Sequence, residues 1–303
     1  MRAILSTPAA SIVSELGRAS GRLMDYTAIG IALALISSLT TASAHALLKA
    51  GNDKLAVRAL MGAVGTVALA PVCFFVPLPT NSLIPWLLTA SALHTTYQLV
   101  LIRAYEASDF AVAYPIARGI APIATAILGM ALLGDQITTG TVVGVGLVSA
   151  GILMVAVGRT IAAGGLIAAG IAGLLTTTYT IVDAHAIRLA PSAMTFVAWF
   201  FLLDGFIMFP IFATLRRGRV TSLLRSEGCQ GFMAGVTSLV SFGSALIALR
   251  LAPVGIVSAL REASVVFGML IAAFFLRESV DQRRAGAAVV IALGAILIVA
   301  TAA

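Results

Sequence analysis

Residues 254–276 read VGIVSALREASVVFGMLIAAFFL, an apolar stretch whose only charged residues are Arg261 and Glu262. A helix of about 20 apolar residues crosses the roughly 30 Å hydrocarbon core of a bilayer. The stretch therefore predicts a membrane-spanning helix that carries two charges near its middle. Ionisable groups at that depth are costly and mark functional sites by default, so Arg261 and Glu262 are also the first candidate site residues.

The rest of the chain repeats this pattern of apolar runs separated by short polar breaks. Residues 1–25 differ, because charged residues interrupt every apolar stretch, and we predict that they form an N-terminal tail. From residue 26 onward the runs have the length of membrane spans. We predict an all-α polytopic membrane protein with ten transmembrane helices, at residues 27–48, 55–77, 83–104, 110–133, 138–157, 164–185, 192–213, 230–250, 254–276 and 284–302.

The composition supports this class and excludes others. Of the 303 residues, 60% are hydrophobic and 10% are charged, whereas soluble domains have about 45–50% apolar and roughly 25% charged residues. The net charge of +7 comes from short clusters between apolar runs, so it does not indicate a nucleic-acid partner. Cys73 and Cys229 lie far apart in the sequence, which favours packing over a disulfide or a metal cluster.

An internal repeat decides the architecture. Residues 111–156 align without a gap to residues 254–299, and in that register Arg118 meets Arg261. The two copies are five predicted helices apart, an odd number, so they have opposite orientations in the membrane. Inverted repeats of this kind are typical of secondary transporters. We predict two inverted five-helix repeats, residues 26–158 and 159–303.

Several short motifs resemble a known family. They are AYEASD (104–109), YPIARGIAP (114–122) and LLGD (132–135) in the first copy, and SALREASVVF (258–267) and FLRE (275–278) in the second. They are similar to the EamA-like branch of the drug/metabolite transporter (DMT) superfamily over nearly the whole chain after the tail. The family's Leu-Gly-Glu turn reads Leu-Gly-Asp in one copy and Leu-Arg-Glu in the other. The resemblance implies ten helices, two EamA domains and export of small metabolites or drugs.

Arg118 and Arg261 are the strongest candidate pair, because each lies about two turns into its helix and the repeat relates them. Two guanidinium groups can hold a carboxylate or a similar anion near the midplane. An ion pair between Arg118 and Glu262 is an equally open interpretation. Glu262 diverges from Arg261 by about 100° around the helix, and proton transfer through its carboxylate is a further hypothesis.

Three helices carry polar stripes, which a lipid-facing surface would not keep. The stripes are Ser37, Thr41 and His45; His94, Tyr97 and Gln98; and Thr176, Tyr179, Thr180 and Asp183. They predict a cavity or a helix contact. The candidate substrate-binding residues are Arg118, Arg261, Glu262, Tyr97, His94, His45, Tyr179, Asp183 and Tyr114.

The remaining charged residues have simpler expected roles. Asp204 lies in the middle of a span, and we expect a structural partner for it. His185 is expected at the interface with the headgroups. We expect four cationic residues at helix ends to reach the membrane interface along their own side chains, namely Lys49, Arg103, Arg188 and Arg250.

These features predict a secondary transporter, and not an enzyme. Its expected role is to export a small polar or amphipathic metabolite from the cytoplasmic (inner) membrane by alternating access. The sequence has neither a phosphate-binding loop nor a His-Glu-x-x-His motif, and we expect no cofactor, metal or catalytic residue. The expected partners are a small, anionic or zwitterionic molecule and the lipid bilayer, and a homodimer is an open alternative. A membrane enzyme or flippase-like protein acting on a lipid-linked substrate, and a non-transporting sensor, are the competing hypotheses.

The membrane orientation is left open. Lys and Arg are more numerous in the loops after odd-numbered helices, which places those loops in the cytoplasm and both termini outside. The family resemblance implies the opposite, with both termini in the cytoplasm.

Overall fold

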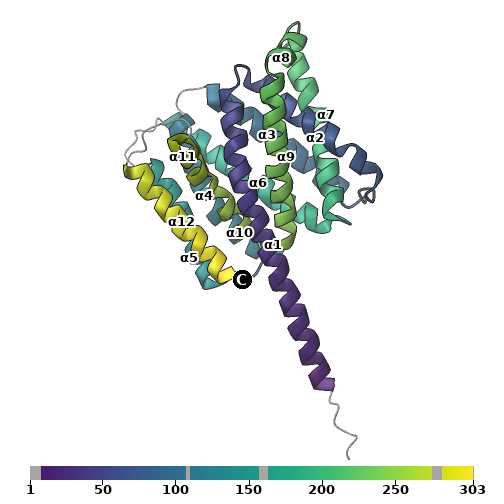
Figure 1. Cartoon of the computed structure of the whole chain (residues 1–303), viewed down its shortest axis with the longest axis vertical. Helices are drawn as coiled ribbons and strands as arrows, with labels where there is room; N and C mark the ends of the chain where they lie inside the picture. Colours follow the sequence, from purple (N-terminus) through teal and green to yellow (C-terminus); the bar gives the residue numbers. More distant parts are fainter. Residues whose placement is uncertain (1–7, 107–109, 157–162, 275–281, 303) are drawn as a thin grey trace, which may run out of the picture.

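Figure 1 shows the computed structural model of the chain, which describes residues 8–106, 110–156, 163–274 and 282–302. The description covers only the backbone at residues 8–24, 49, 101–106, 110–117, 156, 163–169, 172 and 271–274. Every regular element in the described ranges is helical. The elements are α1 (Pro8–Ala50), α2 (Lys54–Leu69), the 3-10 helix η1 (Pro71–Phe74), α3 (Ile84–Glu106), α4 (Phe110–Leu133), α5 (Thr139–Ala156), α6 (Ala163–Leu189), α7 (Ala193–Leu215), α8 (Val220–Ser226), α9 (Gly228–Leu251), α10 (Val254–Glu262), α11 (Ser264–Phe274) and α12 (Gln282–Ala302).

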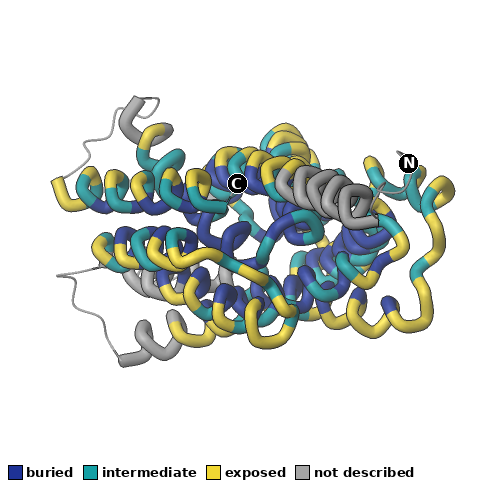
Figure 2. Tube along the Cα trace, turned by 90° about the horizontal axis from the view of Figure 1, so that it is seen from below, coloured by how far each residue is buried: buried dark blue, intermediate teal, exposed yellow. Residues whose placement is uncertain are grey.

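The helices form a bundle with the properties of a multi-pass membrane protein. Large apolar side chains such as Leu174, Phe206 and Ile296 are exposed on its outside. Figure 2 shows that the buried parts of the helices lie toward the interior of the bundle. Within the described residues, five spans are long and apolar enough to cross a membrane, namely Asp25–Leu48, Lys54–Phe74, Ala193–Leu215, Gly228–Leu251 and Gln282–Ala302. The all-helical membrane class is confirmed, and the number of ten spans stays a prediction.

Local sequence signals set several helix ends. Asp53 begins α2, where its carboxylate accepts a hydrogen bond from the Ala56 amide at 3.0 Å, and Ser192 begins α7 in the same way through Thr195. Such side chains satisfy amide groups that have no partner inside the helix. After α4, Gly134 has a φ of +69°, a left-handed conformation that favours glycine and reverses the chain.

Helices of the two halves pack antiparallel against their own repeat counterparts, α2 on α7, α4 on α10 and α5 on α12. The close contacts that establish the directions are Gly62–Gly205 and Gly65–Phe201, then Arg118–Glu262 and Gly129–Val254, and then Gly140–Thr301 and Gly151–Ile291. Equivalent helices that run in opposite directions are what an inverted repeat requires. The structure thus agrees with the inverted architecture that the sequence predicts.

The remaining inner helices exchange partners between the halves. Thr41 of α1 and Ser241 of α9 are joined by a 2.6 Å hydrogen bond, and His94 of α3 contacts Asp183 of α6 at 2.7 Å. Helix α1 therefore packs on the counterpart of α3, and α3 packs on the counterpart of α1. The polar stripes of α1, α3 and α6 are brought into the middle of the bundle by this exchange.

Three elements differ from the sequence prediction. The described part of the predicted span 254–276 is divided at Ala263 into α10 and α11; the Ala263 amide bonds to the Leu260 carbonyl, although its backbone stays in the helical region at φ −58° and ψ −12°. Helix α8 was not predicted; its Leu223 is buried against Leu55 and Phe212. Helix α1 runs without a break from Pro8, so much of the predicted tail continues the first helix, and Figure 1 shows this part extending away from the bundle.

Candidate functional site

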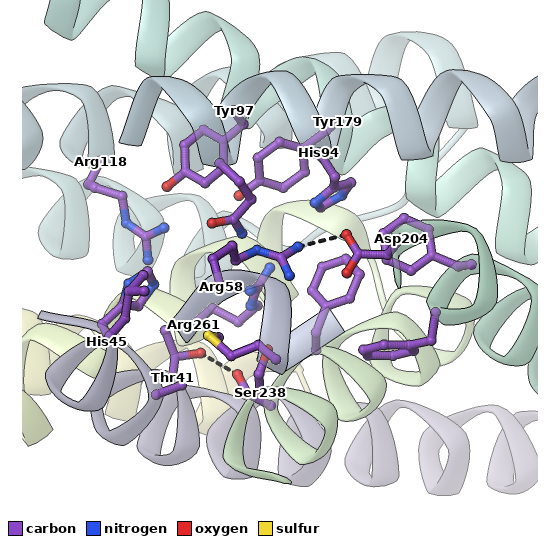
Figure 3. Close-up of a pocket in the computed structure, with 18 residues that line it drawn as sticks. Thr41, His45, Arg58, His94, Tyr97, Arg118, Tyr179, Asp204, Ser238 and Arg261 are labelled. Carbon is purple, nitrogen blue, oxygen red and sulfur yellow. Dashed lines mark hydrogen bonds and ion pairs between the residues drawn. The ribbon is translucent and has the colours of Figure 1, made fainter. Parts of the chain in front are cut away.

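A polar cavity of about 80 Å³ lies in the middle of the bundle, enclosed by helices of both halves (Figure 3). Its walls come from α1, α2, α3 and α4 of the first half and from α6, α7, α9 and α10 of the second. The lining residues are Thr41, Ala44, His45, Leu48, Arg58, Met61, His94, Tyr97, Gln98, Arg118, Tyr179, Phe200, Phe201, Asp204, Ser238, Ser241, Phe242 and Arg261. Cavities that bind small molecules in helical bundles have this position.

Arg118 and Arg261, the pair related by the repeat, both reach this cavity. The Nε of Arg118 donates a 2.9 Å hydrogen bond to Glu262 Oε2, and both side chains are buried. This ion pair joins α4 of one half to α10 of the other. Glu262 does not line the cavity. In this conformation its carboxylate pairs with the Arg118 guanidinium and balances its charge.

Arg261 has different surroundings. No described side chain forms a hydrogen bond or an ion pair with it, and its Nε is buried without an acceptor. The guanidinium lies over the ring of Phe242, 5.9 Å from the ring centroid, within the range of a cation–π contact. The chain turn at Ala263 directly follows. Broken helices commonly form transporter sites, because they interrupt regular backbone hydrogen bonding.

Aromatic rings cover one side of the cavity. The His94 ring lies 4.2 Å from Tyr179 and 4.7 Å from Phe242, measured between centroids, and Tyr97 is 5.2 Å from Tyr179. His94 Nε2 also contacts Asp183 Oδ2 at 2.7 Å, in a nearly fully buried pair. Asp183 itself is outside the cavity wall, so it holds His94 in position from behind the lining.

The structure thus brings most of the predicted site residues together. His45, His94, Tyr97, Arg118, Tyr179 and Arg261 line one cavity, while Glu262 and Asp183 contact its wall. In Figure 3, His45 and Arg118 point toward one another. The side chain of Tyr114 lies outside the described residues. The predicted helix-end residue His185 contacts Trp86, with ring centroids 4.4 Å apart.

One charged pair on the wall was missed by sequence reasoning. Arg58 Nη2 donates a 2.6 Å hydrogen bond to Asp204 Oδ1, and the two side chains are only 7% and 5% exposed. The sequence predicts a structural partner for Asp204, but Arg58 lies near the start of its span and is not among the predicted site residues. A long arginine side chain can extend several ångströms from its backbone into the bundle. Allowing for this length would have made Arg58 a candidate partner for Asp204.

Within the described residues, no group of three or more His, Cys, Asp or Glu side chains is arranged to hold a metal ion. The two cysteines are free, with Cys73 half-buried and Cys229 exposed. The chemistry that the cavity offers is therefore recognition by guanidinium, hydroxyl and imidazole groups and by aromatic faces.

A second charged cluster joins the halves where α4, α6 and α9 end. Arg188 Nη1 donates a 2.6 Å hydrogen bond to Asp135 Oδ1, and Asp135 Oδ2 accepts the Val254 amide at the start of α10 at 2.6 Å. Arg188 also donates to the carbonyls of Leu249 and Ala252. We call Asp135, Arg188 and the Val254 amide the latch.

The latch corrects the expected role of two helix-end arginines. Arg188 is hydrogen-bonded to Asp135 and to two backbone carbonyls. Arg250 donates 3.0 Å hydrogen bonds to the carbonyls of Ile187 and Ala190, near the C-terminal end of α6, where a cation is favourable. At this end of the molecule, the Asp135–Arg188 pair ties the two halves together, and Arg250 ties α9 to α6 within the second half.

At the opposite end, Arg216 Nε donates a 2.7 Å hydrogen bond to Asp53 Oδ2, between the start of α2 and the end of α7. Partial burial alone would raise the pKa of Asp53. The hydrogen bonds from Arg216 and the Ala56 amide outweigh it and hold the pKa below its ordinary value. A carboxyl with a lowered folded-state pKa stabilises the fold above its unfolded pKa, and this stabilisation is lost as the pH falls.

We expect Asp53→Asn to lower the free energy of unfolding at pH 7 by less than about 1 kcal/mol, because asparagine keeps the helix cap and only the partly exposed ion pair is lost. The variant should also lose less stability than the wild type between pH 6 and about pH 3.5. Thermal unfolding in detergent at both pH values measures this. Asp53→Ala, which removes the cap as well, should cost about 1 kcal/mol more; equal acid sensitivity of wild type and Asp53→Asn would contradict the assignment.

Comparisons with known proteins agree with this architecture. The model of the EamA-like transporter family matches residues 28–157 and, a second time, residues 163–300. None of the curated proteins compared with the chain matches it. A solved crystal structure, described only as that of a protein, is 19% identical; the alignment covers 92% of this chain and 98% of that chain, with a TM-score of 0.68. That likeness shows a shared fold.

Proposed function

The chain belongs to the EamA-like transporter family of the DMT superfamily, and on this premise we propose that it is a secondary transporter that exports a small polar or amphipathic metabolite. The substrate would cross by alternating access through the central cavity, and the membrane would be the cytoplasmic (inner) membrane. The observation that carries the proposal is a buried polar cavity, between two inverted halves, in which Arg261 has no described acidic partner.

The positions of the residues support specific roles. Arg261 and Arg118 would bind an anionic group of the substrate, and Glu262 would pair with Arg118 when the anion is absent. Tyr97, Tyr179, His45 and His94 would line the path, with Asp183 and Tyr114 in support. In the coupled form of the proposal, Glu262 is the proton carrier.

The distribution of charge favours this function over the handling of a lipid-linked substrate. A flippase-like protein needs charged groups at a lateral opening toward the lipid. The groove of about 250 Å³ between α2 and α7 is lined by Ala63, Thr66, Val67, Gly205, Phe206, Phe209 and Pro210, none of which is charged. The charged side chains converge in the central cavity instead, as a soluble substrate requires.

Reconstitution tests the proposal directly. Liposomes that contain the purified protein and a mixture of amino acids, hydroxy acids, amines and nucleosides should release one chemical class faster than protein-free liposomes. Arg261→Gln should release it at least about 10-fold more slowly, because a charge-assisted hydrogen bond is lost. Arg225→Gln on the exposed surface of α8 is the matched control and should keep the wild-type rate.

Two results would refute parts of the proposal separately. If no class of solute leaves the liposomes faster than from protein-free ones, the transport function is wrong. If one class does leave but Arg118→Ala and Arg261→Ala both keep the wild-type rate, the function stands and the site assignment is wrong.

A further inference from the structure

Among the described residues, the guanidinium groups at the cavity outnumber the carboxylates that pair with them, and this excess of positive charge indicates the kind of substrate. Three described guanidinium groups line the wall, from Arg58, Arg118 and Arg261. Two carboxylates pair with them, Asp204 at 2.6 Å from Arg58 and Glu262 at 2.9 Å from Arg118. Among the described residues, Arg261 is thus the guanidinium in excess. A buried charge is stable only when a counter-charge or hydrogen-bond partners reach it.

Three buried polar atoms of the described cavity lining have no hydrogen-bond partner, and two of them are arginine donors. Arg261 Nε, Arg58 Nε and the Tyr97 hydroxyl are buried with no hydrogen-bond partner in the described structure, and all three side chains line the cavity. Arginine has no acceptor atoms, and its planar fork matches a carboxylate. The ligand that satisfies these groups is therefore rich in acceptors and carries a negative charge.

Among the described residues, the same wall offers no free carboxylate for an ammonium group. Asp204 is the one carboxylate among the lining residues that the structure describes, and Arg58 is paired with it. Asp183 has a buried Oδ1 without a partner, but it lies outside the lining, and His94 holds its other oxygen. An ammonium in the cavity would face the guanidinium group of Arg261 without a described carboxylate to offset the repulsion, and like-charge repulsion discriminates against a wrong ligand.

The size of the cavity narrows the class further. The free volume is about 80 Å³, roughly half of the ~150 Å³ that holds a benzene molecule in an engineered apolar cavity. In this conformation the site accommodates a carboxylate with a short carbon skeleton, whose apolar part can lie against Phe242 and Phe200.

We propose that the central cavity selects a small monocarboxylate that carries no ammonium group, and that Arg261 binds its carboxylate. This inference rests on the proposed function, since it names the substrate class for the same site. A transporter that selects a monocarboxylate differs from a transporter of zwitterionic amino acids or of cationic amines. Each of those ligands carries an ammonium group, and no described carboxylate of the cavity lining is free to pair with it.

Four probes of nearly equal size separate the charge classes: L-lactate, L-alanine, L-lactamide and L-alaninamide. Lactate and alanine share the carboxylate and differ in the hydroxyl or ammonium beside it, while the two amides remove the negative charge. Binding is measured by thermal shift of the full-length protein in detergent at constant ionic strength. Flux is measured as counterflow of the labelled probes in proteoliposomes.

We expect lactate to bind at least about tenfold more tightly than the other three probes, and Arg261→Gln to lose about 10- to 100-fold of that affinity. Arg261→Lys, which keeps the charge but not the fork, should lose less. Arg225→Gln is again the matched control and should bind lactate as the wild type does.

The two assays distinguish failure of this inference from failure of the proposed function. If alanine or alaninamide crosses faster than lactate, the inference is overturned and the transport function stands. If lactate binds in an Arg261-dependent way but none of the four probes crosses, the substrate class stands and transport is contradicted. If none of the probes binds or crosses, the substrate class is wrong.

Discussion

Replacing Asp204 with asparagine should lower the free energy of unfolding by about 3–5 kcal/mol, the range found when one partner of a buried ion pair is removed. Asp204 and Arg58 are 5% and 7% exposed and 2.6 Å apart. In Asp204→Asn the shape of the side chain is kept, while the Arg58 charge stays buried without its carboxylate. Arg58 Nε has no other partner in the described structure, so no existing hydrogen bond would compensate.

The effect is measured by thermal or denaturant unfolding of the purified protein in detergent. Asp25→Asn is the matched control, because Asp25 is exposed on α1 and should change the stability by no more than about 0.5 kcal/mol. A double variant, Arg58→Met with Asp204→Leu, should recover much of the lost stability, since an apolar pair of similar volume replaces a buried ion pair well. Equal stability of Asp204→Asn and Asp25→Asn would disprove the structural importance of the pair.

Breaking the latch should open one end of the molecule. Asp135→Asn removes the charge that holds Arg188 Nη1 at 2.6 Å, and it weakens the cap on α10 at Val254. Charge-assisted hydrogen bonds of this kind contribute about 1.5–3 kcal/mol each. If the latch keeps this end closed, the open population should rise by about 10- to 100-fold.

A buried cysteine reports this opening. Thr125 is fully buried on α4, between Arg118 and the latch. In a background with Cys73 and Cys229 changed to alanine, Thr125→Cys should react with a membrane-impermeant maleimide at least about 10-fold faster when Asp135 is asparagine. Asp53→Asn, which breaks the ion pair at the opposite end, is the control and should leave the rate unchanged. Equal rates in all three proteins would show that the latch does not govern access.

The part of the fold that depends on local pattern could be predicted from the sequence. The spacing of apolar runs located nearly all helices, and the repeat related Arg118 to Arg261 before any contact was known. The turn at Ala263 was missed because neither glycine nor proline is near it, and such residues are the usual local signal for a break in a helix.

The pairing of charges could be predicted only in part. Glu262 was an open partner for Arg118, because both are ionisable residues inside predicted spans. The contact between Asp135 and Arg188 joins residues 53 positions apart, and nothing in either local sequence indicates the other. Arg58 was missed because depth in the membrane was judged from the position of its backbone, whereas the side chain reaches inward to Asp204.

The antiparallel pairing of each helix with its own counterpart has a consequence for how such a chain can assemble. The repeat counterparts on which α2, α4 and α5 pack, namely α7, α10 and α12, all belong to the other half, so the second half completes much of the interior of the first. A separated half would expose small residues such as Gly144 and Gly151, whose close contacts are all with α12. Its natural complement would be a second half inserted upside down. The single chain therefore resembles a pair of oppositely inserted subunits whose mutual orientation is fixed by the peptide link between them.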